Sequence, residues 1–335
     1  MTTLSRRSVL ALMGGMAAGG LPVQRARSGE RKRILMLLWR GETNAESGFR
    51  AHLRAEGVDF DLIMRDAKMD ISRVADFIEE ARRTRPDLIY TWGTEVTRAV
   101  VGPYDAVDPG RHITDIPVVF TAVTAPVESG IVPSMGPSGR NVTGVSHVPP
   151  LAVQLKALLA YRPVTRIACL YSPATTLSAM TVRELHELCS RQAIELQATA
   201  FPLTDGRPNL AALPQTLGEI ARHEPQFLYL STESVIAANA AIITDEARRL
   251  RLPTFAATEV PLRNGTALCG LVGHYDAAGR MTAHKVLQVL RETLPPGRIP
   301  VERLSRFSYV VNMKVARELD LYPPLAVMDY AELML

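Results

Sequence analysis

Short apolar segments alternate with longer amphipathic segments from residue 33 onward, and no other feature of the sequence constrains the fold as strongly. The apolar segments are continuous runs of about five residues, as strands of buried parallel sheets are. The segments between them carry helical periodicity and are bounded by Gly, Pro or capping residues. The alternation therefore predicts an α/β fold in which helices cover both faces of parallel sheets.

The predicted strands divide the chain into two halves. In the first half, strands are predicted at residues 34–39, 60–64, 87–91 and 116–123, and helices at 44–56, 71–83 and 93–101. In the second half, strands are predicted at 166–171, 194–201, 227–231, 253–257 and 267–272, and helices at 149–161, 175–192, 210–223, 233–250 and 276–290. These strands are too many for one compact sheet, so we expect two doubly wound lobes with a cleft between them.

The first 28 residues have the composition of an export signal. They contain Arg6, Arg7, Arg25 and Arg27, no acidic residue, and a mildly apolar stretch at 9–21. The segment Ser5-Arg-Arg-Ser-Val-Leu10 resembles a twin-arginine signal. The apolar stretch is shorter than the roughly twenty residues of a membrane span, and no Cys follows closely that could carry a lipid. We expect a soluble periplasmic protein without a lipid anchor; a disordered basic tail is the alternative.

The charge of the mature chain is balanced. The sequence has 38 Lys and Arg against 34 Asp and Glu, and four of the arginines lie in the predicted signal. Binding to nucleic acid requires a concentration of positive charge. The mature chain, without the four arginines of the signal, lacks one, so no nucleic-acid partner is expected. The three cysteines, Cys169, Cys189 and Cys269, do not form the spacing pattern of a disulfide framework.

Small polar residues follow the predicted strands in both halves. The clearest case is the strand that begins after Asp115 and ends in Thr121-Ala-Val-Thr-Ala-Pro126, with Asn141-Val-Thr-Gly-Val-Ser146 downstream. In α/β folds ligands bind at the carboxyl ends of strands, and helix starts beyond them favour a carboxylate or another anion. Ordinary helix capping by Ser and Thr is the alternative at each single position.

No motif for catalysis, a metal or a cofactor is evident. The seven histidines lack close ligand spacing, and neither a Gly-x-Ser-x-Gly elbow nor a phosphate loop is present. The glycines at 14–20 lie inside the predicted signal. We therefore expect a binding protein without metal or cofactor rather than an enzyme. An exported α/β enzyme is kept as the alternative; the sensor domain of a transcription regulator is disfavoured because a signal stands where a DNA-binding motif would be.

Several segments resemble the ABC-transporter solute-binding proteins of the tryptophan/tyrosine type. In the family's pattern, a strand is followed by Val-Thr-Asp-Pro-Val, then by a Gly, and then by Asn-Val-Thr-Gly-Val-Ser. This pattern is similar to Phe120-Thr-Ala-Val-Thr-Ala-Pro-Val127 and to Asn141 to Ser146 of this chain. The resemblance is supported by residues 85–90, 166–173 and 311–324. It covers nearly all of the mature chain. The chain departs from the family at Ala125, at Ser172-Pro173 and at Thr91-Trp-Gly93, positions near the expected cleft.

The resemblance implies a type I periplasmic-binding-protein fold, in which two lobes joined by three hinge crossings close on a small ligand and deliver it to an ABC permease of the inner membrane. We expect a monomer that binds an amino acid or related carboxylate, with an aromatic ligand suggested by the family. The expected parts are the signal at 1–28, a first lobe at 29–146 plus 272–300, and a second lobe at 147–271 plus 301–335.

Each lobe is expected to supply half of the site. The expected ligand-binding residues are Trp39, Thr91, Thr94, Thr124 and Ser146 from the first lobe, and Tyr171, Ser172, Thr175, Ser231, Glu233 and Glu259 from the second. Hydroxyls and helix-start amides would hold a carboxylate, and Glu233 or Glu259 would meet an amine. Trp39 and Tyr171 would stack on a flat ligand.

Overall fold

The first of two large sheets is entirely parallel, with strand order β13-β5-β4-β3-β1-β2. The structure is a computed structural model that describes residues 31–173 and 176–335, so the predicted export signal lies outside it. The strands are β1 Arg33–Leu38, β2 Asp61–Asp66, β3 Leu88–Trp92, β4 Val118–Thr121, β5 Val142–Ser146 and β13 Glu302–Arg303.

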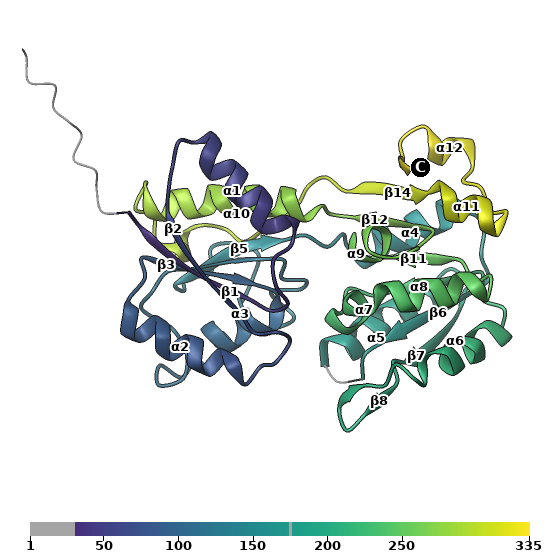
Figure 1. Cartoon of the computed structure of the whole chain (residues 1–335), viewed down its shortest axis with the longest axis horizontal. Helices are drawn as coiled ribbons and strands as arrows, with labels where there is room; N and C mark the ends of the chain where they lie inside the picture. The colour runs from purple at the N-terminus through teal and green to yellow at the C-terminus, as the bar shows by residue number, and fades with distance from the viewer. Residues whose placement is uncertain (1–30, 174–175) are drawn as a thin grey trace, which may run out of the picture. The chain divides into compact units, whose positions relative to one another are not determined.

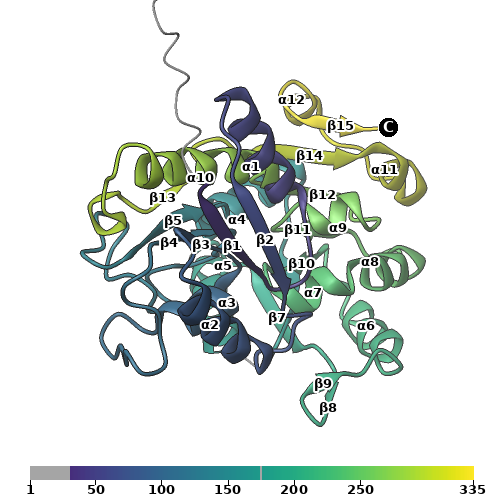
Figure 2. The ribbon, with the colours of Figure 1, turned by 60° about the vertical axis from the view of Figure 1, so that its left-hand side comes forward.

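Helices cover both faces of this first sheet. On one face α1 packs against α10, and on the other face lie α2 and α3 (Figures 1 and 2). The helices are α1 Asn44–Ala55, α2 Arg73–Thr84, α3 Thr94–Val101 and α10 Tyr275–Leu290. Strand β1 is buried from Ile34 to Leu38, as a strand covered on both faces should be.

The second sheet has strand order β15-β14-β12-β11-β10-β6-β7. Its pairs are parallel except for β12 and β14, which run antiparallel. The strands are β6 Arg166–Tyr171, β7 Glu195–Ala200, β10 Phe227–Leu230, β11 Thr254–Ala256, β12 Cys269–Val272, β14 Ser308–Asn312 and β15 Glu332–Met334, and β8 Leu203–Thr204 with β9 Arg207–Pro208 forms a separate hairpin.

Alternate residues of the second sheet enter two different cores. Ile167 and Cys169 of β6 pack on the side of α4 and α5, whereas Ala168 and Leu170 pack on the side of α6 and α8. The helices are α4 Leu151–Tyr161, α5 Thr176–Ser190, α6 Leu213–Arg222, α7 Ser234–Ala238, α8 Ala240–Arg249, α9 Val260–Arg263, α11 Met313–Leu319 and α12 Leu325–Met328, with the 3₁₀ turn η1 at Pro296–Arg298. The doubly wound α/β architecture expected from the sequence is thus confirmed for both sheets.

Several details differ from the expectation. Residues 142–146, expected only to lead into a hinge, form a fifth strand in the first half. Strand β4 ends at Thr121 because Ala122 has a φ of 55°, which an extended strand cannot accommodate. The helix expected at 233–250 is broken at Asn239, whose side chain donates to the carbonyl oxygen of Val235 while its own backbone leaves the helical region.

Three chain segments cross from one sheet to the other, and they lie side by side. The backbone N–H of Leu304 donates to the carbonyl oxygen of Ser146 at 2.9 Å. The second crossing passes just as close to the first, because an added Cβ on Gly273 would stand only 2.1 Å from the carbonyl oxygen of His147. Before the third crossing, Glu302 and Arg303 of β13 still pair with Val145 and Ser146 of β5 in the first sheet. No helix in the described ranges 31–173 and 176–335 is long and apolar enough to span a membrane.

Candidate ligand-binding site

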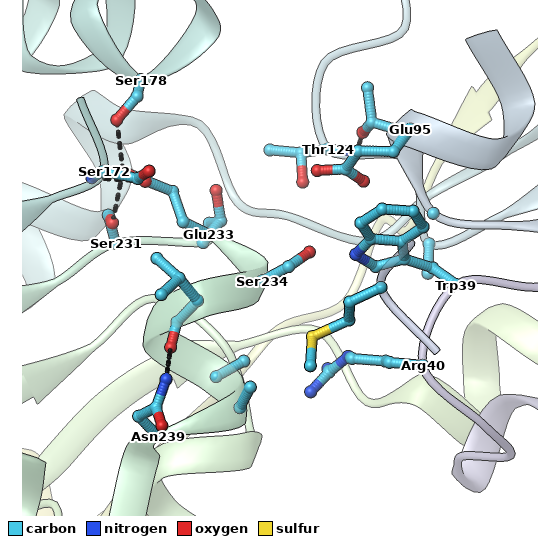
Figure 3. A pocket seen from close by; sticks show the side chains of 18 of the residues that line it. Trp39, Arg40, Glu95, Thr124, Ser172, Ser178, Ser231, Glu233, Ser234 and Asn239 are labelled. Atoms are coloured by element: carbon cyan, nitrogen blue, oxygen red, sulfur yellow. Dashed lines mark hydrogen bonds between the residues drawn. The ribbon is translucent and has the colours of Figure 1, made fainter. Parts of the chain in front are cut away.

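A cavity of about 370 Å³ lies where the carboxyl ends of the strands of both sheets meet. Figure 3 shows its two walls, with Trp39, Arg40, Glu95 and Thr124 on one and Glu233 with its serine neighbours on the other. The first sheet contributes the segments that follow β1, β3 and β4, and the second contributes those that follow β6 and β10. His147 and Tyr275, which belong to or adjoin the crossing segments, complete the lining.

Six of the residues expected from the sequence line this cavity: Trp39, Thr94, Thr124, Ser172, Ser231 and Glu233. Trp39, Ser172 and Ser231 directly follow strands, Thr94 begins α3, Glu233 caps α7, and Thr124 lies three residues beyond β4, so all six stand near carboxyl ends of strands. Gly93, with a φ of 91°, makes the turn from β3 into α3. This positive φ favours glycine, whereas an added Cβ would make only an ordinary contact, 3.4 Å from the Cβ of Trp39.

Four expected residues do not line the cavity, and Thr175 lies outside the described residues. Thr91 is buried within β3, where its hydroxyl shares a 2.8 Å hydrogen bond with that of Thr97. The Ser146 hydroxyl donates to the carbonyl oxygen of Thr124 at 3.0 Å, so it supports a lining residue from behind. Tyr171 packs with the core below α4 and α5, on the same strand face as Cys169.

Glu259, the fourth, lines a neighbouring cavity of about 430 Å³ instead. Its carboxylate lies 3.2 Å from Nε of Arg263 and 3.0 Å from Nδ1 of His274. These partners neutralise the charge that was expected to meet a ligand amine. The two cavities share Arg40 and Tyr275.

Glu233 lines the cavity, but its carboxylate is directed into the second lobe. It accepts hydrogen bonds from the backbone N–H of Ser172, from the hydroxyl of Ser178 at 2.6 Å and from that of Ser231 at 3.0 Å (Figure 3). Burial raises the pKa of Glu233, and the three donors oppose that rise. The carboxylate therefore organises the loops that follow β6 and β10.

Arg40 is the cation of the first wall. Its guanidinium lies 5.0 Å from the ring centroid of Trp92, and its Nη2 donates to the hydroxyl of Tyr275 at 3.3 Å. Trp92 itself donates from Nε1 to the hydroxyl of Thr43. The ring of Tyr275 meets Trp92 edge-on at 6.0 Å, so that two aromatic side chains orient the arginine.

Glu95 is the second residue of α3 and lines the cavity beside Trp39 (Figure 3). Burial raises the pKa of its carboxyl group, and the positive charge of Arg40 acts in the opposite direction. Throughout residues 31–173 and 176–335, no side chain donates a hydrogen bond to this carboxylate. It is the cavity's accessible negative group.

His147 lies at the first crossing, with its ring 4.9 Å from that of Tyr275. Within the described part of the chain neither ring nitrogen has a hydrogen-bond partner. Burial lowers the pKa of His147 to about 4, so the ring is neutral near neutral pH. No group of His, Cys, Asp and Glu in the described ranges could hold a metal ion.

Sequence reasoning missed several lining residues, chiefly Arg40, Trp92, Glu95, His147, Asn239 and Tyr275. Arg40 and Glu95 directly follow the expected Trp39 and Thr94, so their positions at a strand end and a helix start were a usable signal. His147 and Tyr275 carried no such local signal, because they reach the cavity through the packing of the crossings.

Comparisons with known proteins agree with this architecture. A family model described as ABC transporter substrate binding protein matches residues 40–334. A tyrosine-binding protein of Clostridioides difficile (strain R20291) is 27% identical over 266 residues, which cover 79% of this chain and 70% of the relative.

Solved structures show the same fold. The ABC domain in complex with L-Trp from Streptococcus pneumonia superposes with a TM-score of 0.78 at 21% identity, over 91% of this chain and 100% of that one. A conserved domain protein of Vibrio cholerae gives a TM-score of 0.79 at 21% identity, over 91% and 99% of the two chains. The chain therefore belongs to the ABC transporter substrate-binding proteins, of the type I periplasmic-binding fold, which bind substrates rather than convert them.

Proposed function

We propose that this protein is the periplasmic receptor of an ABC importer and that it captures an amino acid or related carboxylate, with an aromatic side chain, in the 370 Å³ cavity. The observation that carries the proposal is the composition of the walls. Trp39, Trp92 and Tyr275 offer aromatic surface, while Arg40 and Glu95 offer opposite charges in the same cavity. The L-Trp complex of one structural neighbour and the tyrosine-binding relative support an aromatic amino acid.

Capture by hinge closure follows from the division of the site. Since each sheet supplies one wall, a ligand makes all of its contacts only when both walls reach it, and binding shifts the population toward that state. The proposed lobes are 32–146 plus 273–303 and 147–272 plus 304–335; residues 302–303 join the first lobe because β13 pairs with β5. Small-angle scattering should show a smaller radius of gyration with saturating ligand than without.

A thermal-shift screen of the mature protein against amino acids and organic acids tests the proposed function. A ligand that binds only the folded state raises the apparent melting temperature in a concentration-dependent way. Isothermal calorimetry on the hits then gives the stoichiometry, which we expect to be one ligand per chain. The ligand should be recovered chemically unchanged; conversion to a product would contradict the receptor role.

Export and partners belong to the same proposal. We expect residues 1–28 to direct export, the permease to be the membrane partner, and the receptor itself to be a monomer that binds no nucleic acid. A reporter fused to residues 1–35 should reach the periplasm. Replacing Arg6 and Arg7 by Lys should abolish its export if the twin-arginine route is used. Retention of export in that variant would indicate another route.

A further inference from the structure

Negative charge exceeds positive charge in the lining of the cavity. The charged side chains there are the carboxylates of Glu95 and Glu233 and the guanidinium of Arg40. His147 adds no positive charge near neutral pH, because burial lowers its pKa to about 4. Burial is the main cause of the raised pKa of Glu233, and the negative charge of Glu95 adds to it. A cationic group placed between the two carboxylates would counteract this effect.

The three carboxylates near the cavity differ in what they already bind. Glu233 accepts from Ser172, Ser178 and Ser231, and Glu259 is held by Arg263 and His274. Glu233 already accepts three hydrogen bonds, and the negative charge of Glu259 is already paired with Arg263 and His274 in the neighbouring cavity, so each gains less from a ligand amine.

Glu95 has no such partners in the described part of the chain, and its carboxylate faces the cavity next to Trp39 (Figure 3). A partly buried carboxylate that has lost some of its water and receives no hydrogen bond from another side chain gains most from a ligand ammonium.

Arg40 is less available to a ligand carboxylate than its charge suggests. Its guanidinium faces the ring of Trp92 and donates from Nη2 to the hydroxyl of Tyr275, so one face and one N–H group are engaged, whereas Nε has no hydrogen-bond partner in the described part of the chain. A ligand that carried only a carboxylate would also add a third negative charge to the cavity.

We infer that the cavity selects its ligand by a protonated amine, that Glu95 receives this amine, and that the flat part of the ligand packs against Trp39. The inference rests on the proposed receptor function and narrows it: ligands are aromatic amines, with or without a carboxylate, and carboxylates that lack an amine are excluded. Glu233 is a positioning residue that holds the serines of the opposite wall.

Calorimetry with three related probes tests this assignment. L-Tyrosine carries both charged groups, tyramine only the amine, and 3-(4-hydroxyphenyl)propionate only the carboxylate; L-tryptophan, tryptamine and indole-3-propionate form a second series. In the unaltered protein, we expect the amino acid and the amine to bind and the acid to bind at least tenfold more weakly than the amine.

Matched variants then locate the amine. Glu95→Gln should weaken the amino acid and the amine by about tenfold to a hundredfold and leave the acid unchanged or slightly tighter. Glu95→Asp, which keeps the charge, should restore part of the loss. Glu233→Gln should change the affinities of all probes by a similar factor, since it disturbs the wall rather than a single contact.

Three outcomes would overturn the inference. The first is an acid that binds the unaltered protein as tightly as its amine does. The second is an equal loss for all probes in Glu95→Gln, which would mean that Glu95 serves only the start of α3. The third is an amine-specific loss in Glu233→Gln. If only amine-free ligands appear in the wider screen, the inference fails and the receptor function stands; if the screen finds no ligand at all, both fail.

Discussion

Nδ1 of His274 lies 3.0 Å from Oε2 of Glu259, which ties the second crossing segment to the residue before α9. On its other side, Nε2 of His274 lies 2.9 Å from the hydroxyl of Ser308 and 3.1 Å from Oε2 of Glu332. One imidazole therefore joins the second crossing segment to the residue before α9 and to strands β14 and β15. Its hydrogen bond with Glu259 raises the pKa of His274, while burial and Arg263 act against the rise.

The first prediction concerns the pH dependence that this imidazole confers. The pKa of His274 is higher in the folded protein than in the unfolded chain, where it is about 6.5. The protonated imidazole therefore stabilises the fold fully below pH 6.5, and this stabilisation is lost as the pH rises through the pKa of the folded protein. His274→Gln should lower the free energy of unfolding by about 1 to 2 kcal/mol at pH 6 and by less at pH 9. Urea unfolding at the two pH values measures this.

His223→Gln, at an exposed position after α6, is the matched control and should change stability little at either pH. An equal loss at pH 6 and pH 9 in His274→Gln would show that the imidazole acts through packing and not through its charge.

The second prediction concerns His147, whose pKa shift has the opposite sign. Burial lowers the pKa of His147 in the folded protein to about 4. The neutral ring therefore contributes fully to stability above the pKa of the unfolded chain, and this contribution is lost as the pH falls toward 4. The shift corresponds to on the order of 3 kcal/mol at most. The variant His147→Phe should therefore lose less stability than the unaltered protein as the pH falls from 7 to 4.

At pH 7, His147→Phe should cost less than about 1 kcal/mol, because the ring has no hydrogen bond to lose within the described residues. Thermal unfolding followed between pH 4 and pH 7 measures both effects. Unchanged acid sensitivity in the variant would contradict the assignment.

The third prediction concerns the close contact between α1 and α10. A Cβ on Gly279 would stand 1.8 Å from the carbonyl oxygen of Ala45, which is backbone and cannot move aside alone. Gly279→Ala should lower the free energy of unfolding by about 2 to 4 kcal/mol, through overpacking between the two helices.

Gly218→Ala is the control for the third prediction. It lies in α6 with no atom within 4 Å of an added Cβ, so it should raise stability by about 0.5 to 1 kcal/mol. Chemical denaturation of both variants tests the pair. Similar effects in the two would contradict the close approach of α1 and α10.

The fourth prediction uses the two tryptophans as reporters. Trp39 and Trp92 are the only tryptophans in the sequence, and both line the cavity. A ligand without an indole, such as L-tyrosine, should therefore change the tryptophan emission on titration. Trp39→Phe should remove most of this change, because Trp92 is already covered by Arg40. A change that persists in Trp39→Phe and disappears in Trp92→Phe would place the ligand on the other ring.

Most of the fold was predictable because its determinants are local. A continuous apolar run such as residues 166–171 becomes a buried strand wherever helices cover both of its faces, and β6 has the predicted limits. The errors occurred where one side chain or one dihedral angle overrides the pattern, as at Ala122 and Asn239. The antiparallel pairing of β12 with β14 was not expected either, since the order and direction of strands are not local properties.

The candidate site was predictable only in part. Position after a strand identified Trp39, Thr94 and Thr124, but it could not separate Thr94 from Thr91, whose hydroxyl turns inward to Thr97. Nor could it show that Glu259 is already neutralised by Arg263 and His274, residues that follow it along the chain and meet it only in the folded protein.

The sequence by itself determined the α/β architecture with two sheets, the polar edges at the carboxyl ends of the strands, and the family to which the chain belongs. The architecture and the polar edges follow from periodicity and composition within short segments, and the family follows from the resemblance of residues 120–127 and 141–146 to its motifs. Only the tertiary structure decided which of three carboxylates is accessible to a ligand, because that depends on donors from distant segments: the serines around Glu233, the basic side chains around Glu259, and the absence of either at Glu95 within the described residues.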